Sequence, residues 1–288
     1  MRRSLAVVSA LTIAAVTAAV APPASAAPDP LPYVALGDSY SAASGVFPLA
    51  SGAPLVCQQS TRNYPHVIAK RIGADLIDVS CGGATTDSFT EPQYPGMAPQ
   101  LDALGRRTKL VTMTIGGNDN LTFAGVILAC GTAGIATLGN GSPCKDLYGS
   151  TFTDTIRQKT FPALTRTLRA VHRKAPNARV AILGAPWIVP RKGGCFQNVP
   201  VGRGDLPYIR NVLRVFNDVT ERAAKRTGST YVDLSRASNG HDACKPPGTR
   251  WVEPAFFPHG SLAFLHPNAY GERRMAERTI RTLGLTRE

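Results

Sequence analysis

Four short motifs carry side chains whose types fit acyl transfer. Ser39 offers a hydroxyl nucleophile directly after an apolar run, and His266 offers a base near the C-terminus. Between them, Gly82-Gly83 and Asn118 offer the N–H groups that an oxyanion would need. A nucleophile, a base and oxyanion donors are together the set that acyl transfer requires.

Each of these residues also has an ordinary structural alternative. We expect Ser39 where a strand turns into a helix, so that N–H groups and the helix dipole face a developing negative charge; the alternative is a helix cap. One N–H of Gly82-Gly83 and the Asn118 amide would stabilise the oxyanion, and the alternative for both is a turn. Asp119 is expected to support its loop.

His266 is followed by Pro267, a residue that favours the first turn of a helix. The imidazole should therefore lie next to a helix N-terminus, where the dipole disfavours imidazolium and keeps the base neutral. Four other histidines compete for the role, namely His66, His172, His241 and His259.

Apolar runs of strand length alternate with longer segments of helical spacing. The expected strands are Tyr33–Leu36, Leu76–Val79, Leu110–Ile115, Arg179–Leu183 and Thr230–Leu234, and the clearest helices are Thr155–Lys174, Leu206–Lys225 and Pro267–Leu283. Such alternation predicts a parallel sheet covered on both faces, with its sites at the carboxyl ends of the strands. Ser39, Gly83 and Asn118 each follow one of the first three strands, so we expect them to converge.

Two stretches show no regular pattern and are expected to form walls or covers of the pocket, Leu121–Asp146 and Pro186–Asp205. The first begins with apolar residues that suit a lipid tail, and core packing is an equal alternative. These residues are Leu121, Phe123, Val126, Ile127 and Leu128. Trp187 has the same two interpretations.

The N-terminal residues predict a secretory leader. Arg2 and Arg3 precede an apolar stretch, and Ala24-Ser25-Ala26 forms a small-residue cleavage signal. We therefore expect residues 1–26 to be removed and residues 27–288 to form a single extracellular domain. A retained membrane anchor is the alternative.

Six cysteines in an exported chain predict three disulfides, which leaves fifteen pairings open. We expect neighbours in sequence to pair, because each bond then closes a local loop around a site segment. The expected bonds are Cys57–Cys81, Cys130–Cys144 and Cys195–Cys244. Zinc is disfavoured because no two cysteines have the close spacing of a structural zinc site.

Lys and Arg outnumber Asp and Glu by 13 (32 against 19), and loss of Arg2 and Arg3 with the leader would leave +11. A basic surface favours anionic partners. The basic residues are spread without an aromatic-rich binding motif, which argues against nucleic acid. For an exported protein we expect the charge to serve solubility or attraction to anionic lipid and cell-wall polymer. We expect a monomer.

Together the motifs resemble those of the SGNH hydrolases, also called the GDSL esterase and lipase family, and most closely its exported actinobacterial branch with three disulfides. The resemblance covers nearly all of the mature chain and implies an α/β fold, a three-layer α/β/α sandwich with a flavodoxin-like parallel central sheet. It implies that Ser39 is the nucleophile and His266 the general base. Gly83 and Asn118 would join the Ser39 N–H in the oxyanion hole, and neither a metal nor an organic cofactor is needed.

The chain departs from the family pattern just before the histidine. The family places an Asp three residues before it, and here that residue is Ala263. Some relatives use a main-chain carbonyl instead, so we predict that the Ala263 carbonyl accepts the imidazole Nδ1–H and that a Ser–His dyad performs the chemistry. A distant carboxylate is the alternative, from Asp233, Asp242 or Glu253.

The expected activity is hydrolysis of lipid esters through an acyl-enzyme, phospholipid acyl hydrolysis included. The activities of the family range from lipases to carbohydrate deacetylases, so the fold does not choose the substrate. A carbohydrate deacetylase is the alternative enzyme. A non-catalytic module that binds lipid or glycan is the alternative from another functional class.

Overall fold

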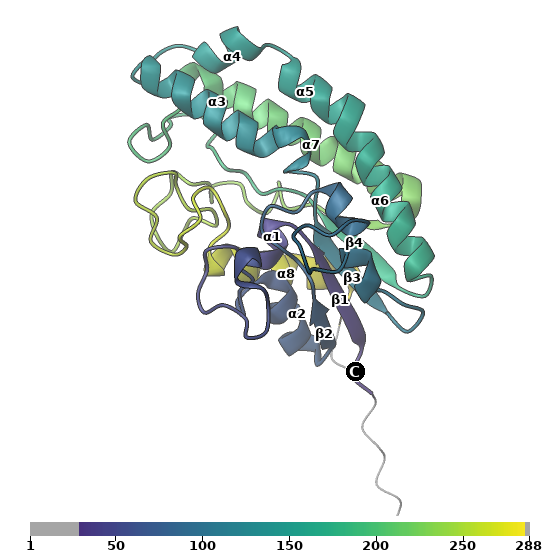
Figure 1. The fold of residues 1–288 in the computed structure, drawn as a ribbon. Coiled ribbons are helices and arrows are strands. Elements are labelled where there is room, and N and C mark those ends of the chain that lie inside the picture. Colours follow the sequence, from purple (N-terminus) through teal and green to yellow (C-terminus); the bar gives the residue numbers. More distant parts are fainter. Residues whose placement is uncertain (1–28, 286–288) are drawn as a thin grey trace, which may run out of the picture.

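The computed structural model describes residues 29–285, and its centre is a five-stranded parallel sheet (Figure 1). The expected leader, residues 1–26, lies outside the described residues. The strands are β1 (Pro32–Gly37), β2 (Asp75–Asp78), β3 (Leu110–Thr114), β4 (Arg179–Leu183) and β5 (Thr230–Val232), in the order β2-β1-β3-β4-β5.

The strand order reverses around β1, which lies between β2 and β3. Val34 of β1 is aligned with Ile77 on one side and with Val111 on the other. This is the flavodoxin-like order, and ligands bind such sheets outside the carboxyl ends of the strands at the switch point. The predicted fold class is confirmed. We expect a binding site in the crevice beyond the carboxyl ends of β1 and β3.

Helices cover both faces of the sheet. The helices are α1 (Ser39–Ala42), α2 (Tyr64–Ile72), α3 (Thr122–Ala136), α4 (Pro143–Tyr148), α5 (Thr151–Thr155), α6 (Phe161–Lys174), α7 (Leu206–Thr227) and α8 (Ala269–Leu283). Successive strand residues point to opposite faces. Tyr33 and Ala35 pack with α2 and α8, whereas Val34 and Leu36 pack on the side of α6 and α7. The molecule is therefore a three-layer sandwich.

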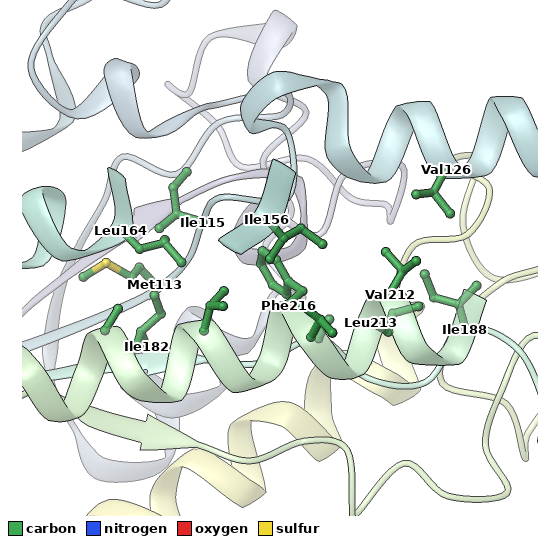
Figure 2. Close-up of a cluster of buried hydrophobic side chains, with 14 of the residues drawn as sticks. Met113, Ile115, Val126, Ile156, Leu164, Ile182, Ile188, Val212, Leu213 and Phe216 are labelled. Carbon is green, nitrogen blue, oxygen red and sulfur yellow. The ribbon is translucent and has the colours of Figure 1, made fainter. Parts of the chain in front are cut away.

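The larger core lies between the sheet, α7 and the outer helices. Figure 2 shows Val212 and Phe216 of α7 pointing toward Val126 of α3 and toward Ile156, which lies between α5 and α6. Burying one such side chain stabilises a fold by about 1.5–3 kcal/mol. This packing fixes the outer helices relative to the strands that carry the site.

The expectation that Leu121–Asp146 is irregular is wrong, because α3 and the first part of α4 occupy it. Its glycines and its lack of a polar face hide the helical pattern. One glycine is needed for packing, since a Cβ on Gly134 would clash with the Pro200 carbonyl. Pro186–Asp205 is irregular as predicted, apart from a 3-10 turn at Arg203–Asp205.

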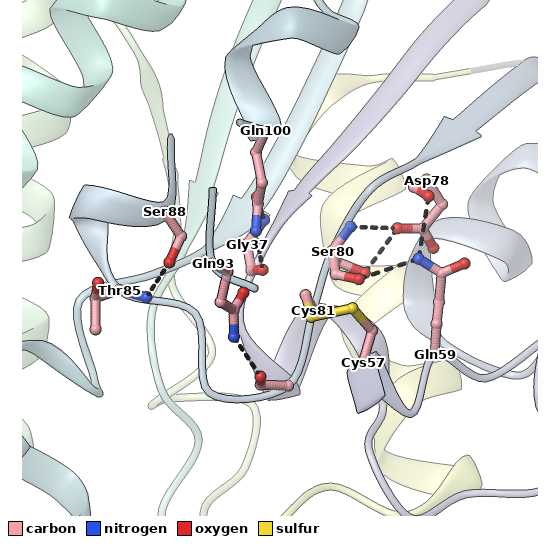
Figure 3. Close-up of a disulfide and its surroundings, with 11 residues drawn as sticks. Gly37, Cys57, Gln59, Asp78, Ser80, Cys81, Thr85, Ser88, Gln93 and Gln100 are labelled. Carbon is pink, nitrogen blue, oxygen red and sulfur yellow. Dashed lines mark hydrogen bonds between the residues drawn. A yellow bond between two sulfur atoms is a disulfide. The ribbon is translucent and has the colours of Figure 1, made fainter. Parts of the chain in front are cut away.

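The structure contains the three disulfides expected from the order of the cysteines, Cys57–Cys81, Cys130–Cys144 and Cys195–Cys244. The first joins the loop after α1 to the segment after β2 (Figure 3). The Gly82 N–H also donates to the Cys57 carbonyl at 2.9 Å. The second joins α3 to α4.

A buried ion pair holds the loop that carries His266. The Glu253 carboxylate accepts hydrogen bonds from Arg250 Nη2 at 2.5 Å, from the His259 N–H at 2.9 Å and from Asn268 Nδ2 at 2.7 Å. The Glu253 N–H in turn donates to the His266 carbonyl at 2.9 Å. Burial alone would raise the pKa of Glu253, but these donors and the Arg250 charge hold it below its usual value.

We predict that Glu253→Gln lowers the free energy of unfolding at pH 7 by about 3 kcal/mol, because it leaves the Arg250 charge buried without its partner. The folded-state pKa of Glu253 is depressed, so its contribution is present above the ordinary value of 4.5 and is lost as the pH falls through the folded value. Urea titrations across this range measure the effect. A difference at pH 7 below roughly 1 kcal/mol, the value for an exposed ion pair, would contradict the prediction.

Candidate active site

Ser39 lies at the sharp turn between β1 and α1. The Asp38 side chain accepts the Tyr40 N–H at 3.1 Å and caps the helix. Gly37 has φ 119°, and a Cβ there would clash with the Thr114 carbonyl, so the turn needs glycine. The Gln100 side chain bonds both the N–H and the carbonyl of Gly37, at 2.7 and 3.0 Å (Figure 3).

His266 lies directly against Ser39. Its Nε2 is 2.7 Å from Ser39 Oγ, and its Nδ1 is 2.9 Å from the Phe264 carbonyl oxygen. A neutral imidazole has one N–H, and a carbonyl can only accept. Nδ1 therefore carries the hydrogen, which leaves the Nε2 lone pair to accept the Ser39 hydroxyl proton. This is the geometry of a nucleophile with its general base.

The prediction that the Ala263 carbonyl orients His266 is wrong by one residue. Leu265 adopts a left-handed backbone, with φ 56°, so the chain turns back on itself. This turn brings the Phe264 carbonyl against the ring of His266. The Ala263 carbonyl instead accepts from Ser261 Oγ at 3.4 Å. The kind of acceptor, a main-chain carbonyl, is the one predicted.

None of the three alternative carboxylates bonds the His266 ring. Asp233 accepts the Ser235 N–H and hydroxyl, and Asp242 accepts the Cys244 N–H. Glu253 is engaged by Arg250, as described above. Glu253 therefore supports the backbone around His266 without touching its side chain.

Tyr40 is a positioning residue that the sequence analysis missed. Its hydroxyl donates to the Leu265 carbonyl at 2.7 Å. Its ring meets the His266 ring edge-on, with centroids 5.0 Å apart. The only signal in the sequence is that Tyr40 adjoins Ser39, and residue type alone does not reveal a bond to a loop more than 200 residues away.

Burial lowers the pKa of His266, and the hydrogen bond to the Phe264 carbonyl opposes this effect. We predicted that the dipole of the following helix would keep the ring neutral, but burial is the main cause of the lowered pKa. Helix α8 begins only at Ala269, after the N-cap Asn268. Burial also raises the pKa of Asp38 to about 7, although the 2.6 Å hydrogen bond that Thr114 Oγ1 donates to its carboxylate acts to lower it. The site therefore favours uncharged groups.

Asn118 and the Gly83 loop lie at the same edge of the sheet. Asn118 Nδ2 donates to the Ala84 carbonyl at 3.0 Å, which leaves the second amide hydrogen available. The Thr86 N–H and hydroxyl donate to Asp119 at 2.9 and 2.7 Å, so Asp119 supports the loop as predicted. Within residues 29–285, neither the Ser39 nor the Gly83 N–H donates to a protein acceptor.

A cavity of ≈ 340 Å³ opens beside Ser39, Asn118 and His266. Its walls are mainly apolar and include Ile115, Phe123, Ile127, Leu128, Leu183, Phe216 and Phe264. Of the wall residues proposed from the sequence, Leu121 and Val126 do not line it: Leu121 is exposed, and Val126 is buried against α7. Gly83 and Trp187 are not part of its lining either. The Trp187 ring lies under the Arg210 guanidinium at 3.6 Å.

The competing histidines have other partners. The ring of His66 bonds Asn63, that of His172 bonds Ser229 and that of His241 bonds the Thr249 carbonyl, while the His259 N–H bonds Glu253. Among the described residues, only His266 reaches the Ser39 hydroxyl. No group of three or more His, Cys, Asp or Glu in residues 29–285 has the arrangement of a metal site.

Comparison with known proteins agrees with this geometry. Residues 35–274 match the model of the GDSL-like lipase/acylhydrolase family. The chain is 58% identical to Lipase 2 of Streptomyces coelicolor over 267 residues, which is 92% of this chain and 90% of that one.

Two solved structures have the same fold. The crystal structure of phospholipase A1 from Streptomyces albidoflavus NA297 superposes with a TM-score of 0.72 and 27% identity, over 89% of this chain and 99% of that one. The extracellular lipase of Streptomyces rimosus gives 0.71 and 28%, over 88% and 98%. The chain is thus an ester hydrolase of the lipase and esterase type, and it belongs to the GDSL-like lipase/acylhydrolase family.

Proposed function

We propose that this enzyme hydrolyses lipid esters through a Ser39–His266 dyad and an acyl-enzyme. His266 removes the Ser39 proton as Oγ attacks the ester carbonyl, and the N–H groups of Ser39 and Gly83 with the Asn118 amide stabilise the oxyanion. The carbonyl re-forms as the alcohol leaves with the proton from His266. Water then attacks the acyl-enzyme along the same path and releases the acid.

The observation that carries this proposal is the pair of bonds on the His266 ring, 2.7 Å to Ser39 Oγ and 2.9 Å to the Phe264 carbonyl. The second bond fixes the tautomer, but a carbonyl bears no full charge. It therefore stabilises the imidazolium of the transition state less than a carboxylate would. We infer a dyad with main-chain orientation.

The pocket favours a long apolar acyl chain over an acetyl group. A second cavity of ≈ 70 Å³ adjoins the first and shares Phe123, Ile127 and Leu265 with it. Its lining contains only apolar residues, glycine and a disulfide cysteine. Similarity to a phospholipase A1 and to lipases supports phospholipid and other lipid esters as substrates.

We propose further that residues 27–288 act as a single extracellular domain and as a monomer, after removal of residues 1–26. Three disulfides suit an oxidising compartment. The net charge of +11 that remains after loss of Arg2 and Arg3 would attract the enzyme to anionic lipid surfaces.

We predict that Ser39→Ala lowers kcat on long-chain and phospholipid esters by about four to six orders of magnitude, and that Asn118→Ala lowers it by about 10²–10³-fold. The test measures acid release from an acetylated sugar, a short-chain ester, a long-chain ester and anionic phospholipid vesicles. Release restricted to the acetylated sugar would indicate a carbohydrate deacetylase. Release that does not depend on Ser39, or no release at all, would contradict the catalytic assignment.

We predict that kcat/KM is lost as the pH falls, with a midpoint below the ordinary histidine value of 6.5, because burial lowers the pKa of His266 and only the neutral ring is a base. Asp38 titrates near pH 7 and must be separated from this effect. The profile of Asp38→Asn should keep the acid limb. A flat profile below pH 6.5, or an acid limb that disappears in Asp38→Asn, would remove His266 as the titrating base.

The dyad predicts that no distant carboxylate takes part in the chemistry. Asp233→Asn and Asp242→Asn should change kcat less than about threefold, in contrast to the roughly 10⁴-fold loss when a triad aspartate is amidated. Circular dichroism would verify that each variant is folded. A loss of several orders of magnitude in one folded variant would establish a triad instead.

A further inference from the structure

Helix α3 has an unusual composition for a helix on the surface. Residues 120–144 contain no charged side chain, although 18% of the whole chain is charged. The segment Asp119–Ala136 is long and apolar enough to cross a membrane, yet only 33% of it is buried. A helix that is apolar all round is ordinarily covered by protein or by lipid.

The described protein covers only one side of α3. Val126 and Cys130 are buried, and Figure 2 shows Val126 pointing toward α7. The disulfide Cys130–Cys144 fastens the helix to α4, so it lies along the fold and does not project from it. An opposite side of α3 therefore remains exposed.

Large apolar side chains occupy that exposed side. Leu128 and Ile135 are seven residues apart within α3, which places them on one face of the helix. Leu121 directly precedes the helix, and Leu138 follows its C-terminus. In this order, the four side chains are 72%, 51%, 71% and 78% exposed. We call these four residues the α3 stripe.

Two members of the stripe are also disfavoured by their backbone. Leu121 has φ 55° and Leu138 has φ 51°, a left-handed conformation that favours glycine or asparagine. A leucine there has a conformational cost, and its exposed side chain gains no burial in return. Asparagine at both positions would be more favourable for the stability of the fold alone.

The α3 stripe is continuous with the entrance of the catalytic pocket. Leu128 belongs both to the stripe and to the pocket lining. Exposed Leu262 and Phe264 lie in the loop just before His266, and Phe264 also lines the pocket. Apolar side chains from two separate segments thus surround the entrance.

We propose that the α3 stripe inserts into the surface of the lipid aggregate that presents the ester. A helix lying in the plane of a bilayer buries its apolar face in the region between headgroups and acyl chains. Because the stripe is uncharged, this contact needs no anionic lipid and differs from attraction by the net charge. The inference deepens the proposed function and rests on it, since the substrate would enter the pocket directly from that surface.

The test compares Ile135→Gln/Leu138→Asn with the parent chain, both in a Ser39→Ala background, for binding to neutral phosphatidylcholine vesicles. Ile135 and Leu138 do not line the catalytic pocket. We expect the double variant to lose at least about tenfold in vesicle affinity, because two large apolar groups no longer enter the lipid. Its melting temperature should stay the same or rise, because asparagine suits the left-handed backbone at residue 138.

A matched control is Ile77→Gln in the edge strand β2, where the side chain is 52% exposed, against 51% for Ile135. This control should bind vesicles like the parent chain. With Ser39 intact, the double variant should hydrolyse a soluble short-chain ester within about twofold of wild type and lose activity only on vesicles.

Four results would overturn the proposal. They are unchanged vesicle affinity in the double variant, an equal loss in Ile77→Gln, binding by the parent chain to anionic but not to neutral vesicles, and a solution dimer that the double variant dissociates. The last would make the stripe an interface between two copies. Vesicle binding is measured in the Ser39→Ala background, so it does not depend on catalysis. Hydrolysis of the soluble ester tests the proposed activity separately. A failure of the stripe to bind lipid is therefore distinguishable from a failure of the proposed hydrolysis.

Discussion

His266 must keep Nδ1 bonded to the Phe264 carbonyl while Nε2 stays 2.7 Å from Ser39 Oγ, and much of the surrounding structure maintains this pair of contacts. A carboxylate partner would add charge and attract the imidazolium, whereas a carbonyl offers direction and little else. The position of the ring therefore has to come from the backbone. Leu265 supplies the turn, Tyr40 bonds its carbonyl, and the buried pair of Arg250 and Glu253 fixes the loop behind it.

The sheet brings the other half of the site to the same place. The switch point between β1 and β3 puts Ser39 and Asn118 beyond neighbouring strand ends, and Asp119 ties in the loop that carries Gly83. Ser39 and Asn118 line a cavity whose walls are mainly apolar. In the proposed mechanism, the ester group would meet oriented donors and a base, and its acyl chain would meet hydrocarbon. The entrance continues outward into the exposed apolar face of α3.

The sequence predicted the strands and the convergence of Ser39, Gly83 and Asn118 at one edge of the sheet, because buried strands and the residues after them leave strong local patterns. Ser39 and Asn118 line the pocket together with His266, whereas Gly83 is not part of its lining. It did not predict α3, since a helix without a polar face and with several glycines lacks the periodic signal of an ordinary surface helix. The left-handed turn at Leu265 makes the Phe264 carbonyl, and not that of Ala263, the acceptor for His266, and no residue type in the sequence indicates this turn. Tyr40, Gln100 and Thr114 act through contacts with segments far away in the chain, and such contacts arise only in the folded molecule.

The most direct test of the account is stoichiometric labelling with a long-chain alkyl phosphonate ester, followed by peptide mass spectrometry and measurement of residual activity. The account predicts one phosphonyl group per chain, on Ser39, with activity lost in proportion to labelling and with much slower labelling of His266→Ala. A label on another residue, full activity in the labelled enzyme, or labelling at the wild-type rate without His266 would contradict the proposed dyad.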